Sequence, residues 1–217
     1  MASKSKKTFF GHNYVVLDLE TSGYSPEEGN FITEIAVIGV DGATLKETVR
    51  AETFVSAYGG EVINQEALDV TGISRGQIES GDSFKNVVKD LIDLAKSLKN
   101  GKHNKPILVA HNSKFERLFL VHLFKCAKKN IWDYFEMDME DTMKMSRDRF
   151  HMESKHDLST VAERFGLAND SAHRALADTE ITFNVFVCFK SQFRQLKTTV
   201  VSGGKSKRFR ETFKFPI

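Results

Sequence analysis

The segment that most restricts the possible folds of this chain is an apolar run at residues 14–19. Acidic residues lie within this run and directly after it. Residues 15–20, VVLDLE, are rich in the branched side chains that favour a β-strand. Asp18 and Glu20 stand one residue apart, so an extended chain projects both carboxylates from the same face. Two like charges at the end of a buried element repel each other unless a cation lies between them. The run therefore predicts a strand that ends at a cation site.

A hairpin and a series of alternating elements follow this strand. Asp41–Gly42 separates two β-rich runs, 31–40 and 43–55, and predicts a tight turn. Further strands are predicted at 107–110 and around 136–140. Helices are predicted at 64–70, 82–100, 113–128, 141–149, 157–165 and 172–195, with Ser113 and Asp141 as helix caps. This order predicts an α/β fold with a mixed five-stranded sheet, its first three strands antiparallel, flanked by helices.

Composition restricts the class of protein. A chain of 217 residues that is 41% hydrophobic and 28% charged is typical of one globular domain. It has no run of apolar residues long enough for a membrane span. The basic start, MASKSKKTFF, is too short for a signal peptide, so a cytoplasmic location is expected. Cys126 and Cys188 lie in apolar stretches and are expected to be free thiols.

Basic residues are concentrated at both ends of the chain. We expect a basic N-terminal tail at 1–11, a folded domain at 12–196 and a basic, aromatic C-terminal tail at 197–217. Residues 8–201 carry 23 basic and 28 acidic side chains, so the body is mildly acidic although the whole chain has a net charge of +2. Such tails indicate either solvated segments or contacts with a polyanion, and the sequence leaves both open.

Acidic and histidine side chains stand where the predicted elements begin or end. Glu116 falls on the first turns of the helix after strand 107–110, and His173 and Asp178 lie near the start of the last helix. Each alone is more often a cap or a solvated charge, but one cleft at the sheet edge can gather them with Asp18 and Glu20. Oxygen ligands without thiolates suit Mg²⁺ or Mn²⁺. Two such ions about 3.5–4 Å apart promote displacement at phosphorus, with His173 as candidate general base.

Four motifs resemble those of the DEDDh superfamily of 3′→5′ exonucleases. They are LDLETSG (17–23) with ITEIAVIGV (32–40), DVTGIS (69–74), VAHNSKFE (109–116) and HRALAD (173–178), and together they cover roughly residues 12–190. The resemblance implies a ribonuclease H-like fold. It also implies hydrolysis of nucleic acid from a free 3′ end by a two-metal mechanism, with release of nucleoside 5′-monophosphates.

The resemblance assigns metal-binding and catalytic roles by position. Asp18 would bridge two Mg²⁺ ions, for which Mn²⁺ is an expected substitute, and Glu20 and Asp178 would complete the shell of one ion. His173 would activate the attacking water. The family's fourth carboxylate is normally Asp, and Glu116 stands in its place with one more methylene. This longer side chain changes where the ligand oxygens lie.

The resemblance also implies residues that contact the substrate and the partners of the chain. The predicted substrate-binding residues are Thr21, Gly23, Val70, Thr71, His111, Asn112 and Phe115. The predicted partners are single-stranded nucleic acid 3′ ends, with DNA favoured and RNA as the alternative, and a DNA polymerase or other replication protein. The sequence leaves open whether the chain is a monomer or a homodimer.

Two other functions compete with an active enzyme. Glu116 and the basic tails are compatible with a catalytically weak or inactive nucleic-acid-binding module of the same fold. The aromatic C-terminal tail is compatible with an accessory protein that docks on a polymerase. An active exonuclease is favoured because the other three acidic positions and the histidine match the family pattern.

Overall fold

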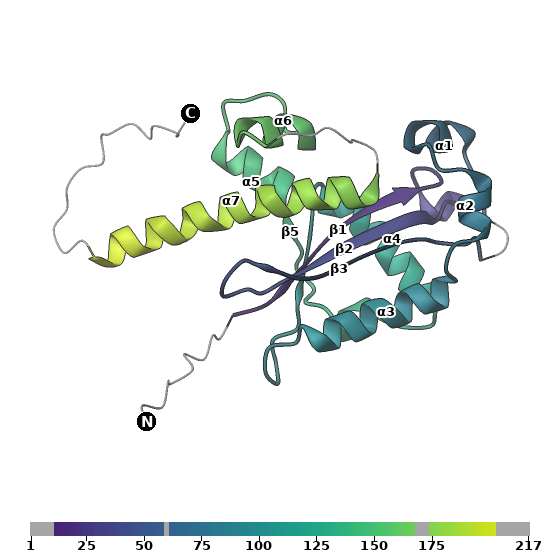
Figure 1. Cartoon of the computed structure of the whole chain (residues 1–217), viewed down its shortest axis with the longest axis horizontal. Helices are drawn as coiled ribbons and strands as arrows, with labels where there is room; N and C mark the ends of the chain where they lie inside the picture. The colour runs from purple at the N-terminus through teal and green to yellow at the C-terminus, as the bar shows by residue number, and fades with distance from the viewer. Residues whose placement is uncertain (1–10, 59–60, 168–173, 203–217) are drawn as a thin grey trace.

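The computed structural model describes residues 11–58, 61–167 and 174–202, and the side chains of the last helix as far as Phe193 (Figure 1). Five strands form one sheet in the order β3-β2-β1-β4-β5. They are β1 (Tyr14–Thr21), β2 (Ile32–Val40), β3 (Glu47–Phe54), β4 (Ile107–Ala110) and β5 (Glu140–Asp141). The β1–β2 and β2–β3 pairs are antiparallel, and the β1–β4 and β4–β5 pairs are parallel. The predicted mixed sheet is confirmed.

Side chains alternate between two covered faces along β1. Val15 and Leu17 pack in the large core beside α3 (Phe84–Ser97) and α4 (Ser113–Cys126). Val16 faces the other way and packs with Phe186 of α7 (Ala175–Ser202). Figure 1 shows α7 lying across one face of the sheet and α3 on the opposite side. Every even-numbered position of β1 therefore points toward α7, which fixes the face on which Asp18 and Glu20 lie.

Four shorter helices complete the fold. They are α1 (Gln65–Thr71), α2 (Arg75–Glu79), α5 (Thr142–Arg149) and α6 (Leu158–Arg164). Single 3₁₀ turns occur at Pro26–Glu28 and Ile131–Asp133. The prediction missed α2, although Ser74 and Gln77 form a capping box at its start, which is a recognisable sequence signal. No helix in the described part of the chain is long and apolar enough to cross a membrane.

The connection between β2 and β3 is longer than predicted. The predicted hairpin is confirmed and turns at Asp41–Gly42, but its second strand, β3, begins at Glu47 rather than at residue 43. The Asp41 carboxylate accepts hydrogen bonds from the amides of Ala43 (3.1 Å) and Thr44 (2.7 Å), which extends the turn. Leu45 then adopts a left-handed conformation with φ of 57°, so that its side chain is buried. The Asp41 side chain thus competes with the two-residue turn that the dipeptide alone suggests.

Several predicted boundaries also move. Ser113 is the first residue of α4 rather than its cap, since Asn112 occupies the cap position. β5 spans residues 140–141 and not 136–140. The last helix is described from Ala175 to Ser202, whereas residues 172 and 173 of the prediction lie outside the described residues. Both cysteines are free, as predicted.

Candidate active site

Asp18 and Glu20 extend the α7 face of β1 beyond its apolar part. At the start of the strand, the Tyr14 ring packs edge-on against Phe186, with 4.9 Å between ring centroids. Farther along, Asp18 pairs with Ala36 and Glu20 with Glu34 on the neighbouring strand. These positions lie toward the first turn of α7, so the helix no longer covers them with apolar side chains. The strand therefore presents two half-buried carboxylates where α7 begins.

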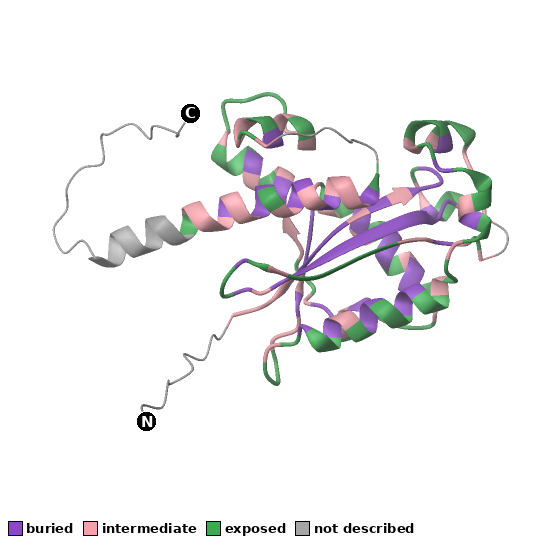
Figure 2. Ribbon diagram, viewed as in Figure 1, coloured by how far each residue is buried: buried purple, intermediate pink, exposed green. Residues whose placement is uncertain are grey.

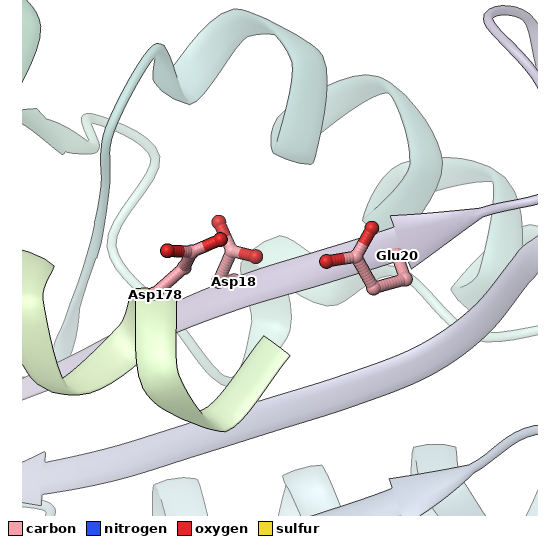
Figure 3. A group of neighbouring side chains, drawn as sticks. All are labelled: Asp18, Glu20 and Asp178. Atoms are coloured by element: carbon pink, nitrogen blue, oxygen red, sulfur yellow. The ribbon is translucent and has the colours of Figure 1, made fainter. Parts of the chain in front are cut away.

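Asp178 joins these two residues from the first turn of α7. One carboxylate oxygen from each of Asp18, Glu20 and Asp178 lies within 4.8 Å of the others. Figure 3 shows the Asp18 and Asp178 carboxylates facing each other, with Glu20 farther along β1. The amino end of a helix carries partial positive charge that favours anions. The fold thus gathers three of the predicted ligands, although they are 160 positions apart in the sequence.

The pKa values of Asp18 and Glu20 are raised. Burial raises the pKa of Asp18 well above its usual range, and repulsion by Glu116, Glu20 and Asp178 adds to the effect. Burial also raises the pKa of Glu20 to about 7, with further repulsion from Asp178 and Glu34 and an opposing effect of Arg174. Without a cation, the Glu20 carboxylate therefore retains part of its proton near neutral pH, and the pKa of Asp18 is shifted in the same direction. A divalent cation would replace bound protons, which is the fit expected of a metal site.

Glu116 is not one of the three clustered carboxylates, but it is electrostatically coupled to them, because its charge makes the largest charge contribution to the raised pKa of Asp18. Its side chain is on the first turn of α4 and only 4% exposed. Its Oε2 atom has no hydrogen-bond partner among the described residues. Burial raises the pKa of Glu116 to about 8, with a contribution from Asp141. An unpaired buried carboxylate oxygen is costly, and a cation ligand role would satisfy it.

Asp141 holds the second-motif loop in place. Asn112 has a left-handed backbone (φ 71°), and its side chain does not cap α4. The Asp141 carboxylate instead accepts hydrogen bonds from the amides of Asn112 (3.3 Å) and Ser113 (3.0 Å) and from Ser113 Oγ (3.0 Å). The same carboxylate accepts from the Lys144 amide (3.0 Å), which confirms the predicted cap of α5. The hydrogen bonds from Asn112 and Ser113 to Asp141 orient α4, the helix that carries Glu116. They could not be predicted from the sequence.

His111 is engaged within the protein through both ring nitrogens. Nδ1 lies 2.8 Å from Thr142 Oγ1, and Nε2 lies 2.9 Å from the carbonyl oxygen of His156. Burial lowers the pKa of His111, which favours the neutral ring, and its Nε2–H donates to the His156 carbonyl oxygen, because a carbonyl can only accept. We therefore expect His111 to shape the loop rather than to contact a substrate directly.

The loop after β1 is closely packed. Thr21 Oγ1 donates a hydrogen bond to the Gly23 carbonyl oxygen (2.7 Å). A side chain at Gly23 would place its Cβ 2.4–2.6 Å from Asn30, so only glycine fits there. The Asn30 side chain in turn donates to the carbonyl oxygens of Ser22 and Val62, both at 3.3 Å. These contacts hold the backbone that is predicted to meet the terminal nucleotide.

The remaining predicted site residues are Val70, Thr71, Phe115 and His173. Val70 and Thr71 form the last turn of α1, and Val70 is 58% exposed. Phe115 packs against Phe119, with 4.9 Å between ring centroids, at the margin of the core. Their contacts with a substrate stay predictions. His173 lies outside the described residues.

Glu34 and Arg174 form a contact that the sequence analysis missed. The Glu34 carboxylate is 2% exposed and accepts from Arg174 Nη2 (2.7 Å), Arg174 Nε (3.2 Å) and the Ala175 amide (3.2 Å). This contact ties the start of α7 to β2, three residues before Asp178 along the helix. A single Glu inside the apolar run FITEIAVIGV was the available sequence signal.

We predict that Glu34→Gln lowers the free energy of unfolding by about 2 kcal/mol, because hydrogen bonds to a charged, buried group are lost. Urea denaturation would measure the change. Glu47→Gln is the matched control, since Glu47 also pairs with an arginine, Arg50, but at the exposed edge of the sheet. The control should change the stability by less than about 0.5 kcal/mol. Equal effects of the two variants would contradict a positioning role for Glu34.

Comparison with known proteins places this arrangement in a family. The family model of the RNase_T exonucleases matches residues 15–186. Ribonuclease T of Photobacterium profundum is 27% identical over 202 residues, covering 88% of this chain and 87% of that protein. DNA polymerase III subunit epsilon of Aquifex aeolicus is 25% identical over 184 residues, covering 85% and 83%. The PolC-type DNA polymerase III of Thermotoga maritima is 27% identical over 195 residues, but the chain spans only 13% of its length.

Solved structures show the same fold. The nuclease domain of 3′hExo, a DEDDh family member bound to rAMP, superposes with a TM-score of 0.71 at 21% identity, covering 84% of this chain and 94% of that one. Escherichia coli exonuclease I in complex with a dT13 oligonucleotide gives a TM-score of 0.70 at 14% identity, covering 88% and 44%. The family match along residues 15–186, together with the two relatives that this chain covers over most of their length, shows that the chain belongs to the RNase_T exonuclease family, in its DEDDh, DnaQ-like branch.

Proposed function

We propose that this chain is a metal-dependent 3′→5′ exonuclease that releases nucleoside 5′-monophosphates from single-stranded nucleic acid, with DNA as the favoured substrate and RNA as the alternative. The observation that carries the proposal is the group formed by Asp18, Glu20 and Asp178, whose oxygens approach within 4.8 Å of one another. Membership of the family supports the reaction class. A DNA polymerase as partner remains part of the proposal, since one matched relative is named as a DNA polymerase III of PolC type and another as the epsilon subunit of DNA polymerase III.

We propose two Mg²⁺ ions, or Mn²⁺ in their place, as cofactors. The clustered carboxylate oxygens and the unpaired Oε2 atom of Glu116 are the kind of ligand that these ions prefer. Asp18, Glu20, Asp178 and Glu116 would hold them. When bound, the ions would neutralise charge that develops on the phosphate and on the leaving oxygen. The charge of the acidic side chains is thereby balanced, which removes the repulsion described above.

The protein's own groups would then position the substrate and move the proton. The backbone from Thr21 to Gly23, held by the Thr21–Gly23 hydrogen bond and packed against Asn30, would contact the last nucleotide. His173 would accept the proton of the attacking water, because histidine is the side chain whose unperturbed pKa lies near neutrality. Glu34 and Arg174 would keep the start of α7 in place while this occurs.

A 5′-labelled single-stranded oligonucleotide tests the proposal directly. With Mg²⁺ or Mn²⁺ we expect a ladder that shortens from the 3′ end, and with EDTA we expect no products. Matched DNA and RNA oligonucleotides, single- and double-stranded, would establish the preference. Salt-sensitive binding without cleavage under any metal would instead support the second candidate, an inactive nucleic-acid-binding module. That candidate is favoured by the position of Glu116 outside the three-carboxylate group.

We predict that Glu116→Asp retains or raises activity with Mg²⁺, because it restores the carboxylate normally found at this position of the family and Mg²⁺ requires near-ideal geometry. Glu116→Gln should lower activity by about a hundredfold, since one anionic ligand is lost. Initial rates with Mg²⁺ and with the geometrically more tolerant Mn²⁺ would measure both effects. A hundredfold loss in Glu116→Asp would mean that the site requires the longer side chain.

A further inference from the structure

Arg174 lies beside the carboxylate cluster of Asp18, Glu20 and Asp178. Its backbone carbonyl oxygen accepts a hydrogen bond from the Asp178 amide (3.1 Å), so Arg174 stands one helical turn before Asp178. Its side chain is bonded to Glu34, which is the register partner of Glu20 on the neighbouring strand. Side chains paired in this way have Cβ atoms about 4.5–5.5 Å apart. The charge of Arg174 opposes the rise in the pKa of Glu20, so the guanidinium acts directly on the cluster.

The contact with Glu34 uses only part of the Arg174 guanidinium. Nη2 and Nε donate to the two carboxylate oxygens of Glu34 at 2.7 and 3.2 Å. A guanidinium carries five N–H donors, of which this contact takes two. Within the described part of the chain, no group accepts a hydrogen bond from Nη1. Donors of Arg174 are therefore left over for a ligand.

The Arg174 side chain is held on the protein side and open to solvent on the other. β2, the strand that carries Glu34, is buried along its whole length (Figure 2), and the Glu34 side chain is 2% exposed. The Arg174 side chain is 48% exposed. Its guanidinium carbon also lies 5.6 Å from the centroid of the Phe54 ring. A guanidinium held by these contacts loses little freedom when it binds a ligand.

A ligand for these donors must present negatively charged oxygen atoms. The planar fork of a guanidinium matches carboxylate and phosphate groups. A phosphate that lies between Arg174 and a cation on the clustered carboxylates has its charge balanced on both sides. The family to which the chain belongs acts on nucleic acid, whose phosphodiester groups carry such oxygens. A phosphate of the substrate is therefore the ligand that fits this position.

We propose that Arg174 binds the phosphate at the scissile bond of the substrate. Nη1 would donate to one of its non-bridging oxygens, while Nε and Nη2 keep their contact with Glu34. After cleavage, the same donor would hold the 5′-phosphate of the released nucleotide. The proposal rests on the exonuclease function proposed above, which supplies the phosphate. It gives Arg174 a contact with the substrate in addition to its role in holding the start of α7.

Titration calorimetry of the Mn²⁺-loaded protein with thymidine 5′-monophosphate tests the proposal. In Arg174→Gln, the affinity for this nucleotide should fall by at least about tenfold, because a hydrogen bond between charged groups is lost. The affinity for Mn²⁺ should stay the same or increase, since a positive charge beside its ligands is removed. Arg50→Gln is the matched control. Arg50 also pairs with a glutamate, Glu180 of α7, and its side chain is 44% exposed, so the control should change neither affinity.

A second variant, Arg174→Lys, keeps a positive charge next to Glu34 and so preserves an ion pair. It lacks the fork that serves Glu34 and a phosphate together, so it should also bind the nucleotide more weakly than the unmodified chain. Unchanged nucleotide affinity in either variant would overturn the proposal. Equal losses of nucleotide and Mn²⁺ affinity would also overturn it, because Arg174 would then only hold α7 in place. Nucleotide binding that depends on Arg174 in a chain that cleaves no oligonucleotide would exclude the exonuclease function and leave the phosphate site standing.

Discussion

Replacing Asp18 with Asn is expected to lower exonuclease activity by at least about a thousandfold and to raise the melting temperature of the metal-free protein. Activity falls because an anionic ligand central to the cluster is lost, and a metal ion supplies several kcal/mol of charge stabilisation to the reaction. Stability rises because burial disfavours a charged Asp18 and because Glu116, Glu20 and Asp178 also repel it when no cation is present. A gain of 1 kcal/mol would raise the melting temperature by about 2–4 °C in a chain of this size.

Steady-state rates and thermal melts in EDTA would measure the two effects on one preparation. Asp148→Asn is a suitable control, because Asp148 is an exposed residue of α5 that pairs with Lys144 away from the cluster. The control should keep both the activity and the melting temperature of the unmodified chain. Activity that survives in Asp18→Asn would show that the measured hydrolysis comes from a contaminant or from another site.

The second large effect is on the pH dependence of stability. In EDTA, the free energy of unfolding should fall as the pH rises from about 4.5 to 8 and then level off. Glu116 has a pKa of about 8 and Glu20 of about 7 in the folded protein, against 4.5 for an ordinary Glu. Between these values the folded chain binds more protons than the unfolded chain, so deprotonation favours unfolding. Each such proton contributes about 1.4 kcal/mol per pH unit.

Adding Mn²⁺ or Mg²⁺ should reverse this trend, because the metal binds the deprotonated carboxylates of the folded state only. The increase in melting temperature on adding metal should therefore be larger at pH 8 than at pH 6. Glu116→Gln should flatten the slope measured in EDTA, and the difference between the two chains isolates the contribution of Glu116. The proposed cation site would be contradicted if the free energy of unfolding in EDTA rises with pH. It would also be contradicted if adding metal at pH 8 does not change the melting temperature.

The strands and most helices could be predicted because their signals are local. The apolar run of β1, the ILVA of β4 and the periodicity of α3 each specify an element within a few residues. Predicted helix and strand boundaries were wrong where a side chain forms hydrogen bonds with the backbone of a different element. Asp141 caps α4 from a neighbouring strand, and this displaces Ser113 from the cap position. Such contacts depend on strand order, which local sequence patterns do not encode.

Asp18, Glu20, Glu116 and Asp178 could be identified from sequence because each stands at the end of an element within a motif. The Glu34–Arg174 contact could not, since it joins β2 to the start of a helix 140 positions away. Its members have no motif spacing between them. Only the packing of α7 across the sheet brings them together.

The sequence by itself determined the alternation of elements, the identity of the acidic residues and the family, because these depend on residue types and their spacing along the chain. The tertiary structure decided which oxygens of Asp18, Glu20 and Asp178 meet, and that burial raises the pKa values of Asp18, Glu20 and Glu116. The physical reason is that repulsion and desolvation depend on distance and solvent exposure. Both are set only when β1, α4 and α7 pack around one end of the sheet.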